Sequence, residues 1–220
     1  MPGASCETGP SPTARATRLD RVRADGPGPL ADLLAALAVP PPWDAQVAPG
    51  EPLAAWLRQA GFAPYAETVL TARRLEGMRS APPVPGVAVA PHRQEWADAF
   101  REAEAEAMAD DPFYLALGGE TGFADAAGHG AFVVARRGDR VVGFAQAAVP
   151  EGWINWVGVV PGERRRGVGR ALLTEVARAV AAARGTHLTC ETVPGGPGHA
   201  FLAAQGFRDR GRQEYLLRAA

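Results

Sequence analysis

The sequence predicts an α/β (α+β) protein, and three observations support this prediction. Segments with strand-like and helix-like periodicity follow one another in the order β-α-β-β-β-α-β-α-β-β over residues 86–220. A glycine-rich turn joins the strand expected at 153–160 to the next helix, as in folds that bind phosphates. A proline-rich stretch at 79–86 separates this series from a shorter one before it, and we interpret it as a linker.

The composition is that of an ordinary globular protein. The chain has 220 residues, of which 47% are hydrophobic and 21% are charged, and its formal net charge is −1. This charge gives no reason to expect nucleic acid as a partner. We expect no membrane span, because the most apolar helix is short and carries charges, and no signal peptide, because the N-terminus lacks a basic region followed by an apolar one. The two cysteines, Cys6 and Cys190, form no disulfide framework or metal-ligand cluster, so we expect a cytoplasmic protein without a bound metal.

The residues before the linker divide into a tail and a small structured unit. Residues 1–17 contain Pro, Gly, Ser and Thr but almost no large apolar residue, which predicts a disordered tail. The elements expected within 18–78 are a helix at 30–37, a strand at 43–47, a helix at 52–60, and one long strand or two shorter ones at 62–75.

The residues after the linker, 87–220, are expected to form one complete domain. Its elements are a strand at 87–90, a helix at 93–108, an irregular segment at 110–128, a hairpin of strands at 131–135 and 141–149, a strand at 153–160, a helix at 168–183, a strand at 188–193, a helix at 197–205 and a closing strand pair at 207–217. Gly158 within its strand predicts a bulge or the close approach of another backbone.

The turn after this strand has the chemistry of an anion site. Gly167 and Gly169 let the backbone approach a ligand, since neither has a Cβ. Backbone N–H groups at the start of a helix favour an anion such as a pyrophosphate. Arginine side chains pair well with phosphate oxygens, and four of them lie here: Arg164, Arg165, Arg166 and Arg170.

The order of elements and this turn together resemble the GNAT superfamily of acyl-CoA-dependent N-acetyltransferases. The acetyl-CoA motif of that family, Q/R-x-x-G-x-G/A, falls on Arg164, Gly167 and Gly169. A second family element, an aromatic residue followed five residues later by Gly-Phe, falls on Phe201 and on Gly206-Phe207. The resemblance implies a mixed, mostly antiparallel sheet with one splayed strand pair, and acetyl-CoA as the cosubstrate.

The resemblance also implies where acetyl-CoA binds. It assigns the pyrophosphate to residues 164–170, Val168 included, and it adds Phe201 to the cofactor site. The pantetheine arm would add to the splayed strands like an extra strand, along the backbone of Val157, Gly158 and Val159. A backbone N–H of the same strand would polarise the thioester carbonyl.

The catalytic residues are less well matched. A lysine-type amine has a pKa of about 10, so the reaction needs a general base. Glu191 is our candidate, because it resembles a strand glutamate that ribosomal-protein N-acetyltransferases use as base; the alternative is a solvated carboxylate. Many members place Tyr after the helix aromatic to protonate the CoA thiolate, but this chain has Leu202 there. Tyr215 and His199 are the candidate replacements, water is another, and Tyr215 is otherwise a core residue.

The N-terminal unit at 18–78 resembles the second half of a degenerate GNAT domain. Residues 55–62 match 200–207 in pattern, and 23–28 keep the R-x-x-G-x-G spacing of 164–169. Prolines within 23–28 and after it remove N–H donors, so this turn is not expected to bind a cofactor. Such a half is too small to close a core alone. We therefore expect it to dock onto the C-terminal domain or a second subunit, as support for a homodimer or one wall of an acceptor cleft.

The sequence thus predicts an acetyltransferase that moves an acetyl group from acetyl-CoA to a primary amine of a small molecule or peptide, by direct transfer in a ternary complex. The alternative is a catalytically weak acyl-CoA-binding pseudoenzyme that acts as a sensor or scaffold, as Leu202 and the degenerate N-terminal copy suggest. Acidic residues in the irregular segment would attract a cationic acceptor; they are Asp110, Asp111, Glu120 and Asp125.

Overall fold

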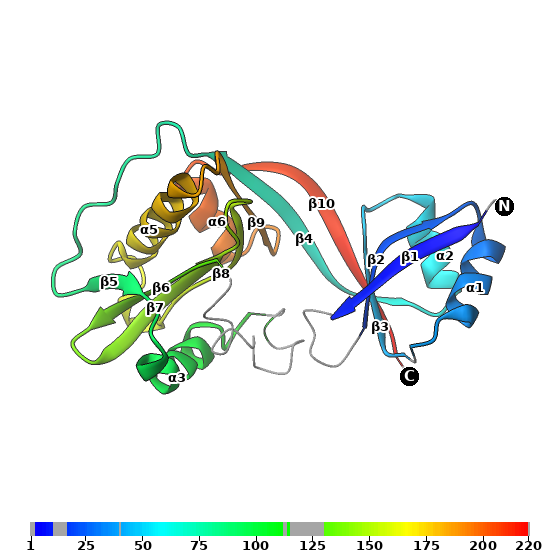
Figure 1. Ribbon diagram of the computed structural model, residues 1–220, viewed down its shortest axis with the longest axis horizontal. Coiled ribbons are helices and arrows are strands. Elements are labelled where there is room, and N and C mark those ends of the chain that lie inside the picture. Colours follow the sequence, from blue (N-terminus) through cyan, green and yellow to red (C-terminus); the bar gives the residue numbers. More distant parts are fainter. Residues whose placement is uncertain (1–2, 11–16, 40, 112–113, 115–129, 220) are drawn as a thin grey trace.

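The fold is built on one large open sheet, seen in a computed structural model that describes residues 3–10, 17–39, 41–111, 114 and 130–219. Within these residues the sheet has ten strands in the order β1-β2-β3-β10-β4-β9-β8-β7-β6-β5. Two neighbouring pairs are parallel, β2 with β3 and β8 with β9, and the others are antiparallel. The predicted mixed, mostly antiparallel α/β fold is confirmed (Figure 1).

The elements lie close to their predicted places along most of the chain. The strands are β1 (Ala4–Pro10), β2 (Thr17–Ala24), β3 (Trp43–Val47), β4 (Ala63–Arg74), β5 (Ala88–Pro91), β6 (Ala131–Arg137), β7 (Arg140–Ala147), β8 (Trp153–Val159), β9 (His187–Thr192) and β10 (Arg208–Arg218). The helices are α1 (Pro27–Ala36), α2 (Pro52–Gln59), α3 (Ala97–Ala107), α5 (Val168–Ala182) and α6 (Pro197–Ala204), with 3₁₀ turns η1 (Gln94–Trp96) and η2 (Pro161–Glu163). Among the described helices, none combines the length and the apolar character that a bilayer span requires.

Two predictions about strands were wrong. The tail expected to be disordered contains β1, which pairs with β2 in an antiparallel ladder. Such a ladder satisfies backbone N–H and C=O groups whatever the side chains are, so the polar composition did not reveal it. The closing strand pair is one strand, β10, in which the register shifts between Asp209 and Gly211. The extra residue at this bulge bends the strand but does not end it.

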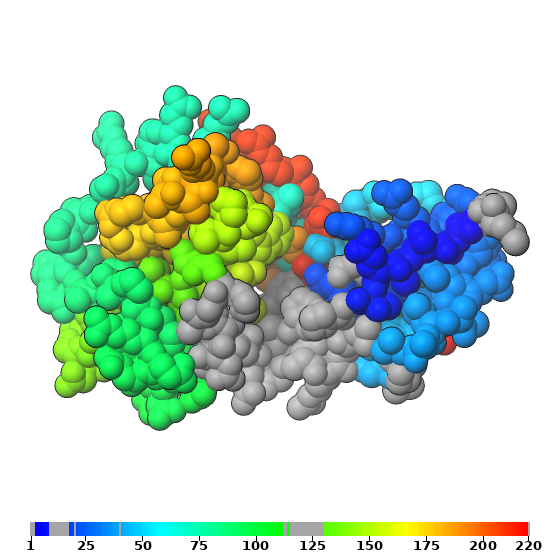
Figure 2. All heavy atoms as spheres, viewed as in Figure 1, coloured from blue at the N-terminus to red at the C-terminus, as the bar shows by residue number. Residues whose placement is uncertain are grey.

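Two separate cores hold the two ends of the sheet. The larger one joins α3 and α5 to the sheet through fully buried side chains such as Phe100, Phe144 and Leu172. The smaller one packs α1 and α2 against β2, β3 and β10, with Leu30 and Leu216 at 0% exposure. In Figure 1, α5 and α6 lie on one side of their part of the sheet and α3 lies on the other. The molecule is elongated in the space-filling view, with β1, β2 and α1 toward one end and α3 and α5 toward the other (Figure 2).

The two halves of the chain exchange their long strands. β4, from the N-terminal half, lies between β9 and β10, and β10, from the C-terminal end, lies between β3 and β4. The linker at 79–86 thus separates the halves in the sequence, whereas their strands interleave in space. Docking of the N-terminal half therefore occurs within the chain, which removes the reason for expecting a second subunit to receive it.

The registers on the two sides of this exchange correspond to each other. Gln46 lies opposite Tyr215 in the β3–β10 ladder, and Leu70 lies opposite Glu191 in the β4–β9 ladder. Gln46 and Glu191 are 145 residues apart, and the same displacement takes Leu70 to Tyr215. It also relates residues 55–62 to 200–207, the segments that match in sequence. When the halves are interchanged, the strand order from β1 to β7 is reversed, so it reads the same from either end.

The N-terminal half nevertheless has no counterpart of the glycine turn. Arg23 and Ala24 lie inside β2, and α1 begins at Pro27, so only Asp25 and Gly26 connect strand to helix. Between β8 and α5, by contrast, lie η2 and four further turn residues. The shared R-x-x-G-x-G spacing therefore does not reflect a shared turn. The residues before this turn, for which no strand was predicted, form β1 and β2.

Candidate active site

The site begins where two parallel strands separate. β8 and β9 pair only at Trp153 with Thr189 and at Ile154 with Cys190, whereas β8 stays paired with β7 as far as Val159. A gap therefore opens along the C-terminal half of β8. This is the splayed strand pair that the family resemblance implies.

The backbone of β8 turns polar groups into this gap. The N–H of Val160 donates to the carbonyl O of Val142 at 3.1 Å, which marks a hydrogen-bonded pair of the β7–β8 ladder. Because such pairs alternate along an antiparallel ladder, Gly158 also bonds to β7, while Val157 and Val159 direct their N–H and C=O groups away from it. The N–H and C=O of Val157 and the N–H of Val159 therefore face the gap, whereas the C=O of Val159 accepts a hydrogen bond from Arg164.

Gly158 has a packing role in the same strand. It lies opposite Phe144 of β7, and a Cβ at this position would come within 2.5 Å of the Phe144 ring. The approach predicted for Gly158 thus exists, but a side chain makes it and not another backbone. The aromatic ring fills the space over the strand and holds it flat against α3.

The glycine turn has the geometry expected of an anion site. Gly167 is the N-cap of α5 and has a φ of 89°, in the left-handed region that glycine tolerates best. The first helical bond runs from the N–H of Ala171 to the carbonyl O of Gly167, so the N–H groups of Val168, Gly169 and Arg170 point out of the helix start. No acidic residue lies in the first turn of α5. The positive end of the helix dipole thus faces the turn.

Gly169 and Phe201 form one wall of the turn. A Cβ on Gly169 would lie 3.1 Å from Cζ of Phe201 and 3.6 Å from Cγ2 of Val159. The half-buried ring of Phe201, which belongs to α6, therefore rests directly on the glycine. This contact joins the two family motifs in space and brings α6 to the edge of the site.

The side chain of Arg164, which the resemblance assigns to the pyrophosphate, bonds to two backbone carbonyl groups instead. Its Nε donates to the carbonyl O of Val159 and its Nη2 to the carbonyl O of Ala107, both at 2.9 Å. The side chain therefore ties the end of β8 to the C-terminal end of α3, where a cation is favourable. Arg165 and Arg170 have exposed side chains, and Arg166 lies 3.7 Å from Glu163. Those three arginines remain at the surface of the turn.

Glu163 holds the glycine turn in place through an ion pair with Arg137. Two nitrogens of Arg137 donate to its two carboxylate oxygens at 2.9 Å each. This bidentate bond lowers the pKa of Glu163, and the charge of Arg166 adds to the effect. The turn is thus fixed to the β6–β7 hairpin by an ion pair.

The predicted catalytic pair, Glu191 and Tyr215, is brought together across β4. The Tyr215 hydroxyl donates to Oε2 of Glu191 at 2.5 Å, although the two residues lie on strands separated by β4. Ala66 of β4 lies opposite Tyr215, and its small side chain lets the phenol reach over that strand. Burial and the Glu191 charge raise the pKa of Tyr215, so the phenol keeps its proton at neutral pH.

Two further donors on Glu191 were missed from the sequence. Nε2 of Gln46 donates to Oε1 at 2.8 Å, and the hydroxyl of Thr68 donates to Oε2 at 3.3 Å. Both come from the N-terminal half, from β3 and β4. The signal that identifies Gln46 is the displacement of 145 residues, which pairs it with Glu191. Thr68 gave no comparable signal.

A further set of polar side chains lies beside the cluster around Glu191. Asp44 lies two residues before Gln46 on β3 and therefore on the same face of the sheet. It is 0% exposed, accepts a hydrogen bond from the Tyr65 hydroxyl at 3.3 Å and lies 3.4 Å from Arg18. The Arg18 guanidinium in turn lies over the Tyr215 ring, 5.4 Å from its centroid. The face beside Glu191 is thus lined by polar side chains of both halves.

The remaining candidates lie outside the site or in the core. Leu202 is 1% exposed and belongs to the larger core. Cys190 is buried, and burial raises its pKa to about 12, which leaves its thiol protonated at neutral pH. His199 bonds to Asp209 at 2.9 Å at the surface of α6. Glu120 and Asp125 of the predicted acceptor segment lie outside the described residues.

Comparison with known proteins identifies the family. The model of the acetyltransferase (GNAT) family matches residues 90–207, more than half of the chain. The chain therefore belongs to the GNAT family of acetyltransferases, and this membership supports acyl transfer from a CoA donor. A search of curated protein sequences returned no match.

Solved structures support the same fold. A GCN5-related N-acetyltransferase from Kribbella flavida is 18% identical, with a TM-score of 0.67 over 93% of this chain and 82% of its own. A tandem GNAT protein from the clavulanic acid biosynthesis pathway is 16% identical, with a TM-score of 0.64 over 92% of this chain and 74% of its own. For a GCN5-related N-acetyltransferase from Sphaerobacter thermophilus the identity is 19% and the TM-score 0.59. The match covers 80% of this chain but only 59% of the Sphaerobacter chain, so this protein spans about three fifths of that length.

Proposed function

We propose that this protein transfers an acetyl group from acetyl-CoA to a primary amine of a small molecule or peptide, directly and in a ternary complex. The observation that carries the proposal is the gap between β8 and β9, which opens beside the glycine turn and next to Glu191. The two free cysteines of the chain fit a reducing compartment, and we propose the cytoplasm as its location.

The donor would bind along the gap and the turn. The N–H groups of Val168, Gly169 and Arg170 suit the two phosphates of the pyrophosphate, with the exposed side chains of Arg165 and Arg166 beside them. The amides of the pantetheine arm suit the N–H and C=O of Val157 and the N–H of Val159, which face the gap. Arg164 would act indirectly, because its side chain holds β8 in place. Phe201 would shape the wall beside the phosphates.

The proposed reaction is an acyl substitution. The lone pair of a neutral amine forms a C–N bond with the thioester carbonyl carbon, and a backbone N–H of β8 stabilises the negative charge that develops on oxygen. The amine proton passes to Glu191, directly or through a water molecule. The C–S bond then breaks, and the CoA thiolate leaves with a proton from water.

Glu191 is the proposed general base because it is fixed and has room to act at the end of β9. Donors from Tyr215, Gln46 and Thr68 orient its two oxygens. We assign Tyr215 a positioning role and not that of the general acid. Its raised pKa makes it a weaker proton donor than a free phenol, and its hydrogen already points at Glu191.

A thiol-release assay tests this function. Acetyl-CoA is offered with a panel of amines, and free CoA is measured with a thiol-reactive dye. We expect Glu191→Gln to lower kcat by about a hundredfold or more with the KM for acetyl-CoA unchanged, because general bases contribute roughly 10²- to 10⁴-fold. Glu67→Gln, at an exposed carboxylate of the neighbouring strand β4, is the control and should keep full activity.

Two results would count against the proposal. Equal rates for the Glu191→Gln variant and the unmodified protein would exclude Glu191 as the base. Tight CoA binding without thiol release for any amine would favour the sensor or scaffold, an alternative that has no support from the family or from the similar structures.

A further inference from the structure

A second basic site lies beside the glycine turn. It is a cavity of about 310 Å³ lined by Arg73, Gly77, Met78, Arg79, Arg170, Ala204 and Gln205. The lining comes from the end of β4, the segment after it, the first turn of α5 and the end of α6. Arg170 belongs both to the glycine turn and to this cavity, so the two are continuous. A volume near 300 Å³ is at the lower end of the range for ligand pockets.

The cavity gathers positive charge without compensation. Three of its lining residues are arginines, and no carboxylate lines it. In the part of the chain that the structure describes, none of these three takes part in an ion pair, whereas Arg58 pairs with Glu214 and Arg137 with Glu163. Like charges that converge on one space repel each other, and an anion between them removes that repulsion. The cavity is therefore suited to a phosphate group.

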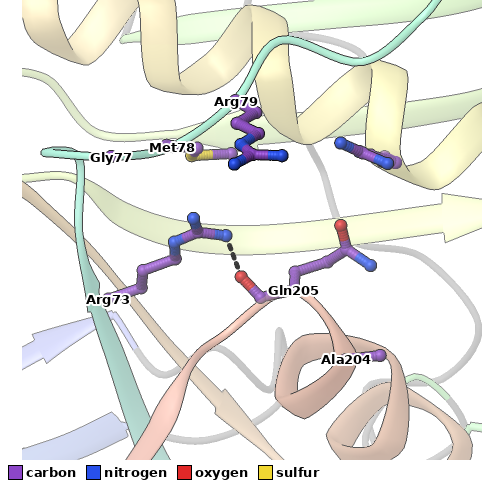
Figure 3. Close-up of a pocket in the computed structure, with 7 residues that line it drawn as sticks. Arg73, Gly77, Met78, Arg79, Ala204 and Gln205 are labelled. Carbon is purple, nitrogen blue, oxygen red and sulfur yellow. Dashed lines mark hydrogen bonds between the residues drawn. The ribbon is translucent and has the colours of Figure 1, made fainter.

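The orientation of the side chains agrees with this charge. Figure 3 shows the guanidinium groups of Arg73 and Arg79 reaching toward each other from opposite sides of the cavity, with Gln205 beside them. Arg73 donates from Nη1 to the carbonyl O of Gln205 at the end of α6. This bond uses one of five N–H donors of the guanidinium and fixes its plane. Arg79 comes from the segment after β4 and is exposed.

We propose that Arg73, Arg79 and Arg170 bind the 3′-phosphate of the CoA nucleotide. This proposal rests on the proposed function, which places the pyrophosphate on the adjacent glycine turn. Besides that pyrophosphate, CoA carries a third phosphate on its ribose. Arginine forks match the oxygens of such a terminal phosphate in bidentate geometry. Through Arg73 and Arg79, the strand exchanged from the N-terminal half and the segment after it recognise the cosubstrate.

A structural role alone does not account for the cluster. A cation at the C-terminal end of α6 is favourable in itself, and this explains the bond from Arg73 to Gln205. It does not explain why Arg79 and Arg170 line the same cavity. The test therefore compares two ligands that differ only in the 3′-phosphate.

Calorimetry with CoA and with 3′-dephospho-CoA, at one ionic strength, distinguishes phosphate binding by the arginines from a purely structural role. It needs no acceptor. We expect the unmodified protein to bind CoA about tenfold or more tightly than dephospho-CoA, since a hydrogen bond to a charged group is worth roughly this factor. Arg79→Gln and Arg73→Gln should each remove most of this preference by weakening CoA binding alone. Arg74→Gln changes the next residue of β4, which does not line the cavity, and should leave both affinities unchanged.

Three other outcomes would overturn the 3′-phosphate site. Equal affinity of the unmodified protein for both ligands overturns the 3′-phosphate site and leaves the proposed function intact. A preference for CoA that survives in both the Arg79→Gln and Arg73→Gln variants also overturns it. If neither ligand binds, the proposed function itself fails, and the assignment of the cavity fails with it.

Discussion

His92 is a half-buried histidine whose ring nitrogens have no polar partner among the described residues. It stacks on Phe132 with a centroid distance of 4.4 Å and lies 5.7 Å from the Phe100 ring. Both ring nitrogens are shielded from solvent and form no hydrogen bond within the described part of the chain. Burial lowers the pKa of His92, because the charged imidazolium would lose its hydration.

This environment predicts a loss of stability in acid. In the unfolded chain His92 has a pKa of about 6.5, so below that pH the unfolded state binds a proton that the folded state resists. The free energy of unfolding should therefore fall as pH decreases from 7.5 to 5.5. In His92→Phe this part of the decrease should disappear, as measured by denaturant unfolding at both pH values. His187→Gln, at an exposed histidine, is the control; identical pH slopes for all three proteins would contradict the prediction.

Single residues of the site could be predicted to different extents. Glu191 was chosen as the candidate base by its resemblance to a family glutamate, and Tyr215 as one of the candidate replacements for the missing acid. Their contact was not predictable, because β4 lies between their strands and comes from a distant part of the sequence. Arg164 matches the family motif, but its hydrogen bonds to two backbone carbonyls depend on where α3 ends. A motif gives the type of residue, whereas its contacts depend on elements that the motif does not contain.

At the scale of elements, β3 of the N-terminal half supports the base on β9. Gln46 is the counterpart of Glu191 under the displacement of 145 residues, and the two side chains are bonded to each other. One half thus supplies a carboxylate, and the other supplies an amide that orients it. Gln46 is a positioning residue, because it acts on the reaction through Glu191.

Gln46→Leu should lower kcat by about tenfold and leave the KM for acetyl-CoA unchanged. The variant removes one hydrogen bond to a charged group, which is worth roughly that factor. A purely structural defect would instead lower the melting temperature and weaken acetyl-CoA binding together with the rate. Gln59→Leu, at an exposed residue of α2, is the control. A fall in melting temperature with kcat per folded molecule unchanged would show that Gln46 serves stability only.

The elements themselves were largely predictable where local signals are strong. β3, α2, α5 and α6 combine periodic apolar residues with Pro or Gly at their ends, and they formed within a few residues of their predicted bounds. β1 has no such signal, because its partner strand satisfies its backbone. The length of β10 was misjudged for a similar reason, since a register shift allows a strand to continue through Gly211.

At the scale of the whole molecule, the exchange of β4 and β10 predicts that the halves cannot be separated. A chain that begins at Pro82 lacks β1 to β4, which leaves β9 with an unpaired edge and β10 without either of its partner strands. We expect it to aggregate and to lose CoA binding. A chain that begins at Thr17 lacks only the outermost strand β1 and should keep CoA binding. Gel filtration and calorimetry measure both; a monomeric, active chain from Pro82 would contradict the interleaved sheet.

The exchange was beyond sequence reasoning for a physical reason. The similarity of 55–62 to 200–207 indicated a repeat but not which strands pair, since each half could equally pair with itself. Only long-range hydrogen bonds between β4 and β10 decide this, and no local pattern encodes them. The linker at 79–86 reinforced the impression of two independent units.

The position of β10 also has a consequence for the order in which the chain can fold. Leu216 is synthesised long after α1 and α2, yet it is fully buried in the core that these two helices form. The N-terminal half therefore stays incomplete until β10 has been synthesised, with its apolar face uncovered in the meantime. Contacts between such distant residues also slow folding, because a long loop must close before they form. We expect the nascent protein to depend on protection by chaperones during this interval more than a GNAT domain whose strands pair locally.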